Sequence, residues 1–456
     1  MRATLIRRFG LNRAVVFSVL LKGWQSLSGL LGLILIGRYF APEVQGYYYT
    51  FASLVALQSF VELGLYIVVS NVASHEWARL RVGADGHIEG DPVALSRLVS
   101  LGRFVFKWYA WAALAFFLIA GSGGYWFLER AQASAIDWRA PWILHMAFSA
   151  VLLWCMPFLS LLEGCNQFAL VARFRILMAV AGSLGFWAAI VAGANLWAAP
   201  VLSAVSAIAC IYYLAVTQRK FFLPFFERPT HGGMNWRRQI LPMQWRLALQ
   251  GVVSYLVFSL LTPVMFHYHG SVVAGQMGMT MQLVMAVQSI ASIWVLTKVP
   301  RFGVLVAQGD FGRLDVEWRS ATFLSVLMMV GGGALLVGSL YLLTVMQVAG
   351  VDRVLPPLAF VLLTVGALFS VGSQSLAIYL RAHKREVLMR AGLVSGVLMG
   401  FLVWQLGARY GPMGASASYM FVMSCVAFPM ALHVWHVSRR DWHGTAATLH
   451  DDPSDA

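Results

Sequence analysis

Long apolar segments recur along the whole chain and leave few folds open to it. Twelve runs of about 17 to 25 residues are each long enough, as a helix, to cross a hydrocarbon core of roughly 30 Å. They cover residues 14–37, 47–70, 104–127, 141–163, 176–194, 197–217, 246–266, 275–297, 321–346, 354–380, 391–407 and 413–437. Only 11% of the residues are charged and 59% are hydrophobic, whereas roughly 25% are charged in an ordinary soluble domain. We therefore predict an all-α polytopic membrane protein.

Basic residues predict which side of the membrane each loop faces. The N-terminal segment, the C-terminal segment and five loops together hold 27 of the 33 Lys and Arg residues. These five loops cover residues 71–107, 164–175, 218–246, 298–319 and 381–390. Because cytoplasmic loops are enriched in Lys and Arg, we predict twelve spans with both termini in the cytoplasm. The same bias and the anionic lipid surface explain the net charge of +14, so we expect no nucleic acid among the partners.

Several motifs that would indicate enzymes or metalloproteins are missing from the sequence. The four cysteines are scattered in or beside apolar segments, without the spacing of a metal site or a disulfide framework. No Gly-rich loop with a Lys is present to bind nucleotide phosphates. The basic N-terminus is followed by an apolar run without a small-residue cleavage site, which predicts a first span rather than a signal peptide. We therefore expect no cofactor, no metal and no catalytic residue.

The two halves of the chain resemble each other. Residues 43–62 align without gaps on residues 273–292, with identities that include Gln58/Gln288 and Ser59/Ser289. The ends of the fourth and tenth spans also correspond, once an insertion in the loop after the second span is allowed for. Parallel repeats of this kind are an architecture of alternating-access transporters. The predicted domains are an N-terminal six-helix lobe (1–217), a cytoplasmic linker (218–245), a C-terminal six-helix lobe (246–437) and a cytoplasmic tail (438–456).

Lys22 and Glu62 are charged residues inside predicted spans. Each lies about eight residues from the cytoplasmic end of its span, which is roughly 12 Å at 1.5 Å per residue. Because buried charge in a membrane is costly, such residues are candidates for function. We infer a Lys22–Glu62 pair that lines a central cavity, where Lys22 attracts an anionic substrate and Glu62 orients it or exchanges a proton. The alternatives are a structural ion pair and a lysine that snorkels to the surface.

Other candidate substrate-binding residues lie in both halves. Arg246 opens the seventh span and could contact a phosphate with two hydrogen bonds, although it could equally be one more cytoplasmic anchor. Tyr255 lies on a polar face of the same span, as expected beside a water-filled cavity. Gln25, Gln58 and Gln288 could donate hydrogen bonds to sugar hydroxyls. Hydrogen bonding between helices is the alternative for each of these glutamines.

Two stretches of the sequence resemble a known family. One runs from Ile240 to Gly309, and the other is GRYFAPEVQGYYYTFASLVALQSFVELGL near the N-terminus. Both resemble the lipopolysaccharide and polysaccharide biosynthesis transporters of the multidrug/oligosaccharidyl-lipid/polysaccharide (MOP) exporter superfamily. In that family the segment after the first span often has a Gly-Arg, an Ala-Pro-Glu and a Gly-Tyr. Here these are Gly37-Arg38, Ala41-Pro42-Glu43 and Gly46-Tyr47.

The resemblance implies a fold and a function. The fold is that of the MATE-like transporters, with two six-helix lobes that face each other across a cavity. The implied function is a Wzx-type flippase in the bacterial inner membrane, which moves an undecaprenyl-pyrophosphate-linked oligosaccharide of an O-antigen or exopolysaccharide to the periplasmic leaflet. Implied partners are this substrate, membrane lipids, H⁺ or Na⁺ as the coupling ion, and the polysaccharide polymerase machinery. Two alternatives stay open, a multidrug or cation antiporter on the same fold and a membrane polymerase or ligase.

Overall fold

The computed structural model describes most of the chain. It covers residues 13–62, 64–83, 85–130, 136–227, 241–348, 350–383, 385 and 387–450, and within them the side chains at 13–16, 18, 19, 241–248, 250 and 443–450 lie outside the described set. The described residues are helical almost throughout, and the strands found among them are the two of one small sheet. The chain divides into two compact units, an N-terminal unit (Met1–Val252) and a C-terminal unit (Val253–Ala456).

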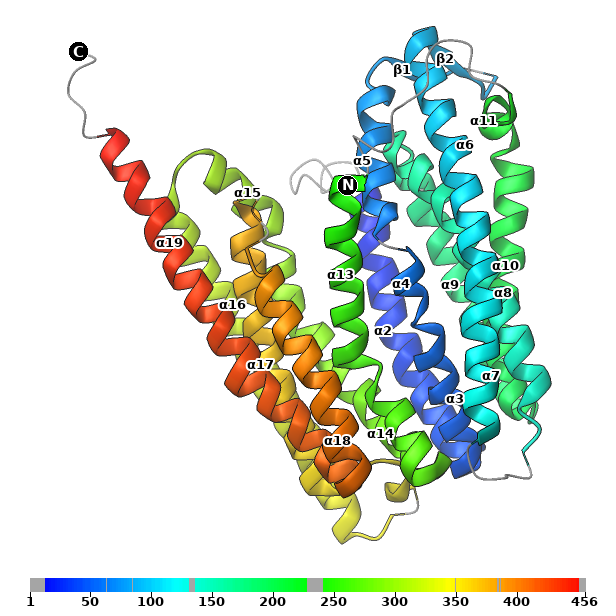
Figure 1. The fold of residues 1–456 in the computed structure, drawn as a ribbon, viewed down its shortest axis with the longest axis vertical. Coiled ribbons are helices and arrows are strands. Elements are labelled where there is room, and N and C mark those ends of the chain that lie inside the picture. Colours follow the sequence, from blue (N-terminus) through cyan, green and yellow to red (C-terminus); the bar gives the residue numbers. More distant parts are fainter. Residues whose placement is uncertain are drawn as a thin grey trace, which may run out of the picture. The chain divides into compact units, whose positions relative to one another are not determined.

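The N-terminal unit is a bundle of long helices (Figure 1). Its elements up to residue 164 are α2 (Arg13–Tyr39), α3 (Pro42–Val55), α4 (Gln58–Glu62), α5 (Leu65–Trp77), β1 (Leu80–Val82), β2 (Ile88–Gly90), α6 (Pro92–Ala115), η1 (Phe116–Ala120), α7 (Gly121–Arg130) and α8 (Arg139–Gly164). There follow α9 (Phe168–Val191), η2 (Asn195–Trp197), α10 (Ala198–Tyr212), η3 (Tyr213–Thr217), α11 (Arg219–Phe222), η4 (Leu223–Phe226) and α13 (Leu241–Phe258), which runs across the unit boundary.

Local sequence signals explain where helices of this unit begin. The carboxylate of Asp91 accepts a hydrogen bond from the Val93 backbone N–H at 2.9 Å, and Pro92 occupies the first turn of α6. An Asp cap followed by Pro satisfies or removes N–H groups that would otherwise lack partners. Just before this cap, β1 and β2 pair antiparallel with Leu80 opposite Gly90. The hairpin thus occupies the loop after the second predicted span, where the repeat comparison requires an insertion.

The C-terminal unit is a second helical bundle. Its elements are α14 (Leu261–Leu296), α15 (Val299–Ala307), α16 (Phe311–Val345), η5 (Val351–Arg353), α17 (Pro357–Ala382), α18 (Met389–Phe421), η6 (Val422–Ala427) and α19 (Phe428–His450). The predicted cytoplasmic tail begins at residue 438, and α19 extends into it as a helix to His450. Side-chain contacts at Arg439, described below, attach this last stretch to α16.

The helices confirm an all-α polytopic membrane fold. In the described parts of the chain, nine helical segments are long and apolar enough to cross a membrane, or ten if the bent pair α3–α4 and α5 is one span. Two of the nine are 57 and 54 residues long, far more than the roughly 20 residues that one crossing needs. Each contains a glycine with non-helical angles, Gly270 (φ 84°) and Gly411 (φ 60°). Counting the bent pair as one span and dividing both long segments at these glycines would give the predicted twelve, a number that stays a prediction.

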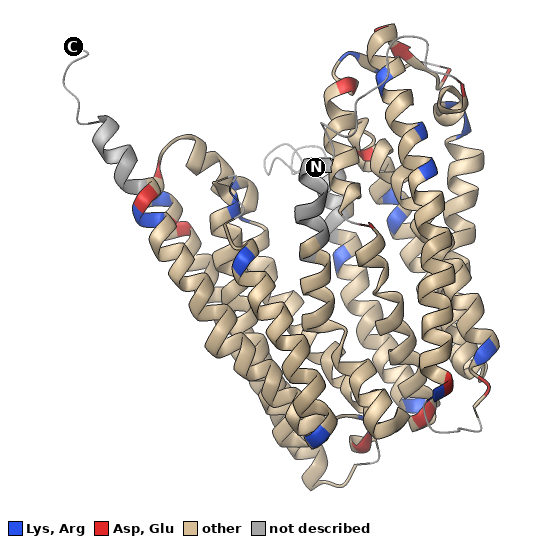
Figure 2. Cartoon of the chain, viewed as in Figure 1, with Lys and Arg blue, Asp and Glu red and all other residues tan. Residues whose placement is uncertain are grey.

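One helix forms the centre of each unit. In the N-terminal unit α8 packs against α5, α6, α9 and α10, and it is the most buried of the apolar spans. In the C-terminal unit α17 packs against α14, α16, α18 and α19. Figure 2 shows that Lys, Arg, Asp and Glu gather toward the ends of the helices, while the long middle stretches are almost free of charge. This distribution is expected for helices whose middle parts lie in hydrocarbon, because a charged side chain is costly there.

Candidate functional site

A charged cluster joins three helices of the N-terminal unit. Arg175 of α9 forms an ion pair with Glu163 of α8, with 3.2 Å between Nη2 and Oε1. The same guanidinium donates a hydrogen bond to the hydroxyl oxygen of Tyr66 in α5 and lies 5.3 Å from the centre of its ring. Both ends of the ion pair are largely shielded, with side-chain exposures of 31% and 18%. We call Arg175, Glu163, Tyr66 and nearby Glu62 the Arg175 cluster.

Helix geometry brings these side chains together. α8 ends at Gly164 and α9 begins at Phe168, and the turn between them uses Asn166 in a left-handed conformation (φ 60°). Asn tolerates that conformation better than most residues. Arg175 is seven residues into α9, roughly 10 Å along its axis, so its long side chain reaches back to the end of α8. The Ser160 hydroxyl of α8 donates to the Tyr66 backbone carbonyl and holds α5 against the same place.

Glu62 lies where the second predicted span is broken. It is the last residue of α4, it is partly buried, and α5 begins at Leu65 after a bend of 42°. Gly64, between the two helices, has φ 65° and ψ 13°, a left-handed conformation that glycine adopts without steric cost. The cation that interacts electrostatically with Glu62 is Arg175. Glu62 therefore belongs to the Arg175 cluster and lies beside the break in this span.

The predicted Lys22–Glu62 ion pair is not formed. Among the residues that the structure describes, no ion pair within 4.0 Å joins Lys22 to any carboxylate, and the field at Glu62 comes from Arg175 instead. The prediction placed both residues at the same depth, but depth does not determine which helices are neighbours. α2 packs chiefly against α9, and the face of α2 that carries Lys22 is not part of this contact.

Lys22 and Gln25 lie on a face of α2 that the N-terminal unit leaves exposed. The opposite face packs through Trp24, whose indole donates to the Ser183 hydroxyl of α9 at 3.1 Å. Lys22 precedes Trp24 by two residues and is therefore nearly opposite it on the helix, and Gln25 lies one turn after Lys22. Both side chains are exposed. Lys22 and Gln25 thus form a polar stripe in an apolar helix, without covering contacts from α9.

The remaining predicted site residues lie on other helices, and their role stays a prediction. Gln58 opens α4 and is partly buried. In the C-terminal unit, the Gln288 amide of α14 donates to the Ser370 hydroxyl of α17 at 3.0 Å, the helix-to-helix bonding expected as its alternative role. Tyr255 is only 8% exposed. Arg246 is in α13, but its side chain lies outside the described residues.

The C-terminal unit also has a cluster of an arginine, a carboxylate and a tyrosine. Asp315 of α16 accepts hydrogen bonds from the Tyr379 hydroxyl of α17 at 2.7 Å and from Arg439 Nε of α19 at 3.0 Å. The rings of Trp318 and Trp435 stack at 5.2 Å beside it. We call Arg439, Asp315 and Tyr379 the Arg439 cluster.

His383 caps the helix that carries Tyr379. Its Nδ1 lies 3.1 Å from the Tyr379 carbonyl, and its ring stacks on Phe311 with 6.0 Å between centres. Burial lowers the pKa of the His383 imidazole below its ordinary range, and the hydrogen bond to the Tyr379 carbonyl partly opposes this shift. A lowered pKa keeps His383 neutral at physiological pH, so the Arg439 cluster gains no further charge from it.

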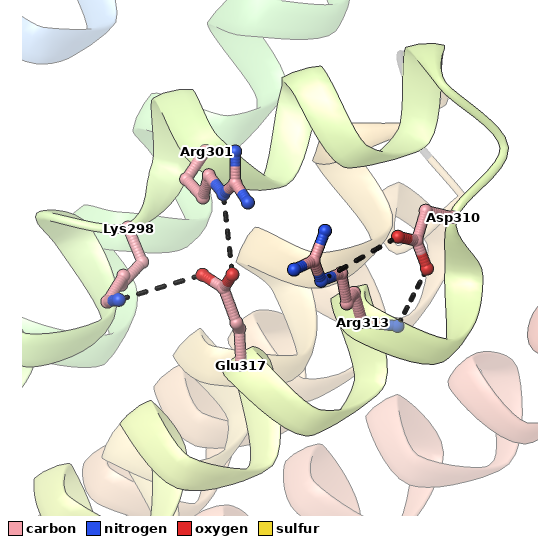
Figure 3. Close-up of polar contacts among 5 residues, drawn as sticks. All are labelled: Lys298, Arg301, Asp310, Arg313 and Glu317. Carbon is pink, nitrogen blue, oxygen red and sulfur yellow. Dashed lines mark hydrogen bonds and ion pairs between the residues drawn. The ribbon is translucent and has the colours of Figure 1, made fainter.

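A second set of ion pairs joins α15 to α16. Glu317 of α16 lies 3.6 Å from Lys298 Nζ and 3.3 Å from Arg301 Nε (Figure 3). Asp310 caps α16 by accepting the Arg313 backbone N–H at 3.0 Å. These side chains are one quarter to nearly three quarters exposed. Exposed pairs of this kind contribute little to stability, so we read them as fastening the loop rather than as a binding site.

Sequence reasoning missed both arginine clusters. The sequence places Arg175 in the predicted basic loop 164–175 and Arg439 in the predicted tail. Both lie inside helices in the structure, because α9 begins at Phe168 and α19 runs to His450. The available signal was the uninterrupted helix-forming sequence on both sides of each arginine, without Gly or Pro to end a helix.

Comparison with known proteins identifies the fold. No protein-family model and no curated protein matches the sequence. Among solved structures, the lipid II flippase MurJ in an inward closed conformation has a TM-score of 0.66 at 11% identity, over 93% of this chain and 87% of that chain. The MATE multidrug transporter DinF-BH, solved as a complex with a ligand, gives 0.62 at 13%, over 94% and 96%.

A third structure agrees with these two. It is an inward-facing multidrug resistance MATE family transporter of the MOP superfamily, with a TM-score of 0.61 at 12% identity over 94% of this chain and 100% of that chain. Identities this low establish a common fold and no more. The predicted MATE-like fold is therefore confirmed over nearly the whole chain.

Proposed function

We propose that this protein is a flippase for an undecaprenyl-pyrophosphate-linked oligosaccharide. The substrate, a repeat unit of an O-antigen or exopolysaccharide, would pass from the cytoplasmic to the periplasmic leaflet of a bacterial inner membrane. The fold supports a transporter, since the structures that share it are a lipid II flippase and multidrug transporters. The observation that supports an anionic substrate is the position of Lys22, an exposed cation inside an apolar span.

The lack of a partner for Lys22 in the described part of the N-terminal unit favours an anion. Glu163 is ion-paired with Arg175, and Glu62 lies in the field of the same arginine. Lys22, in contrast, has no ion pair or hydrogen bond among the described residues. Lys22 is thus the cation of this group that has no carboxylate partner within the described ranges. A pyrophosphate would supply the counter-charge that stabilises a lysine at this depth, and Gln25, one turn away, could hydrogen-bond the first sugar.

The broken second span supplies a means of moving between states. α4 and α5 meet at Gly64, which can change its backbone angles at low cost, and Glu62 adjoins this hinge. A change in the Glu62–Arg175 interaction, for example when H⁺ or Na⁺ reaches Glu62, would alter the bend. The flippase would then work by alternating access without a covalent step. It would be a transporter rather than an enzyme, and it would deliver its product to the polymerase machinery.

A multidrug or cation antiporter is the second candidate. The observation that favours it is Glu62, because a carboxylate within a span is the group that a cationic drug or coupling ion needs, and two of the structures with this fold are multidrug transporters. The two candidates differ in the charge of the substrate. Lys22 should be essential for an anion, whereas Glu62 alone should be essential for a cation.

Reconstitution tests the proposal. The purified full chain would be placed in proteoliposomes, and a labelled polyprenyl-pyrophosphate oligosaccharide followed from one leaflet to the other. Lys22→Gln should lower the initial rate by about tenfold to hundredfold, the cost of one hydrogen bond to a charged group in a poorly hydrated site. Lys298→Gln is the matched control, because it removes a surface lysine of the other unit.

The second readout is efflux of a small cationic dye by the same vesicles. Glycolipid movement that needs Lys22 but not Lys298 supports the flippase. Dye efflux that survives Lys22→Gln and is lost in Glu62→Gln, without glycolipid movement, would replace it with the antiporter. Elongation or transfer of glycan by the purified protein would instead indicate a polymerase or ligase.

A further inference from the structure

The N-terminal unit has an apolar cavity that opens beside two cations. It lies between α6, α8, α10 and the segment 218–227, and its volume is about 480 Å³. Aromatic and aliphatic side chains such as Phe106, Trp154 and Phe222 form its walls, and Lys107 and Arg219 are its charged lining residues. The cavity belongs wholly to this unit and contains none of the substrate-binding residues proposed above.

A second cavity continues the first along the helices. Its volume is about 370 Å³, and it shares Ala110 and Trp154 with the first. Together they form a groove that follows α6 and the start of η1 from Phe106 to Phe117. Phe117 is eleven positions after Phe106, which is roughly 16 Å along a helix axis. This length is about half of a 30 Å hydrocarbon core. The length of the groove along the helix therefore matches the thickness of one bilayer leaflet.

The two cations lie at the boundary of the hydrocarbon. After Lys107 the chain has no charged residue through 108–128, and before Arg219 it has none through 196–218. A stretch of 20 or more uncharged residues is long enough to cross the hydrocarbon region of a membrane as a helix. Both cations therefore lie at the edge of that region. Both are exposed. Neither has an ion pair or hydrogen bond in the described part of the chain, which leaves them free for a bound phosphate.

The segment that carries Arg219 is held in place on α6. Arg103 donates to the backbone carbonyl of Phe226 at 3.1 Å, and Lys220 Nζ donates to that of Asp85 at 3.1 Å. Phe222 packs edge-on against Phe158, with 5.3 Å between ring centres. These residues are the first ten of the predicted cytoplasmic linker 218–245, and they are docked on the N-terminal unit. Arg219 is thereby fixed at the mouth of the groove.

We propose that this groove binds an anionic phospholipid of the surrounding bilayer. One acyl chain would lie along α6 and α8, and the phosphate would sit between Lys107 and Arg219. The apolar walls suit a hydrocarbon chain, the leaflet depth suits a chain from one leaflet, and the paired cations suit a phosphate without a compensating positive group. The 55-carbon tail of the proposed substrate is much longer than this groove. The bound lipid would join α6 to the segment that leads toward the second unit.

Native mass spectrometry of the purified full chain in detergent tests this site. Phosphatidylglycerol should remain bound at a concentration where phosphatidylcholine with the same acyl chains does not. The double variant Lys107→Gln/Arg219→Gln should weaken phosphatidylglycerol binding by roughly thirtyfold, since two surface cations are removed from an anionic headgroup. The matched control is Lys298→Gln/Arg313→Gln, which removes two exposed cations from the other unit.

A second variant tests the hydrocarbon part of the groove. Ala110 is exposed and lines both cavities, so Ala110→Trp should fill the groove and displace the lipid while both cations remain. Ala334→Trp, at an exposed position of α16, controls for the added tryptophan. Equal binding of the two lipids, or unchanged binding in the double variant, would overturn the proposal. Displacement of phosphatidylglycerol by a polyprenyl phosphate would also overturn it, and would assign the groove to the tail of the substrate.

Discussion

Each unit carries a cluster built around one arginine, but the two clusters have different surroundings. Each cluster joins an arginine, a carboxylate and a tyrosine from three helices: Arg175 with Glu163 and Tyr66, and Arg439 with Asp315 and Tyr379. The Arg439 cluster joins unbroken helices beside stacked tryptophans. The Arg175 cluster adjoins a broken span and has a second carboxylate, Glu62, in the field of its arginine. Arg439 therefore interacts with one carboxylate, whereas Arg175 interacts with two.

This difference separates a structural contact from a candidate moving part. A charge pair that is fully matched and embedded in continuous helices holds those helices in register. An arginine shared by two carboxylates has alternative pairings of similar energy, and beside a hinge these can correspond to two bends of the span. We therefore expect changes in the Arg439 cluster to affect stability alone. Changes in the Arg175 cluster should affect stability and transport together.

Removing each arginine should produce the largest effects. Arg175→Met leaves two carboxylates without their cation, and we expect a loss of about 3 kcal/mol, against about 2 kcal/mol for Arg439→Met. Thermal unfolding of the purified protein in detergent measures both. Adding Glu163→Gln to Arg175→Met should restore part of the loss. Equal losses for the two arginines would contradict the idea that Arg175 serves two acids.

Removing one tyrosine hydroxyl from each cluster should have an intermediate effect. Tyr66→Phe and Tyr379→Phe each delete one hydrogen bond to a charged group, at roughly 1.5 kcal/mol. We expect similar shifts in melting temperature but a change in glycolipid flipping only for Tyr66→Phe, because Tyr66 adjoins the hinge. A transport defect in Tyr379→Phe at normal protein levels would show that both clusters take part in the cycle.

Stiffening the break in the second span should cost about 1 kcal/mol. Gly64→Ala forces a side chain into a left-handed conformation and should slow flipping if the bend changes during transport. Gly338→Ala in α16 is the matched control, since nothing lies within 4 Å of the added Cβ and alanine favours a helix. Unchanged transport in Gly64→Ala would argue that the bend is static.

The ion pairs between α15 and α16 should have the smallest effect. Glu317→Gln removes the partner of Lys298 and Arg301. Because these pairs are partly exposed, we expect about 0.5 kcal/mol, reduced further by salt. Melting temperatures at low and high ionic strength measure this. A loss of unfolding free energy as large as that of Arg439→Met would mean that these pairs stabilise the fold as much as the Arg439 cluster does.

The prediction of fold succeeded because the signal is carried by each segment separately. A run of apolar residues such as 176–194 is a membrane helix whatever its neighbours are, since hydrocarbon leaves a backbone few other ways to satisfy its hydrogen bonds. The breaks at Gly270 and Gly411 agree with the predicted hairpins for the same local reason. The prediction of partners failed at Lys22 and Glu62, where equal depth was taken for proximity.

The sequence by itself determined that this protein is a helical membrane protein and approximately where its spans lie. Only the tertiary structure decided that Glu62 and Glu163 share Arg175, a residue 109 positions from Tyr66, and that Arg439 holds the last helix to α16. The physical reason is that hydrophobicity acts along one axis, the membrane normal. Contacts between helices depend on rotation and packing around that axis, which no single segment encodes.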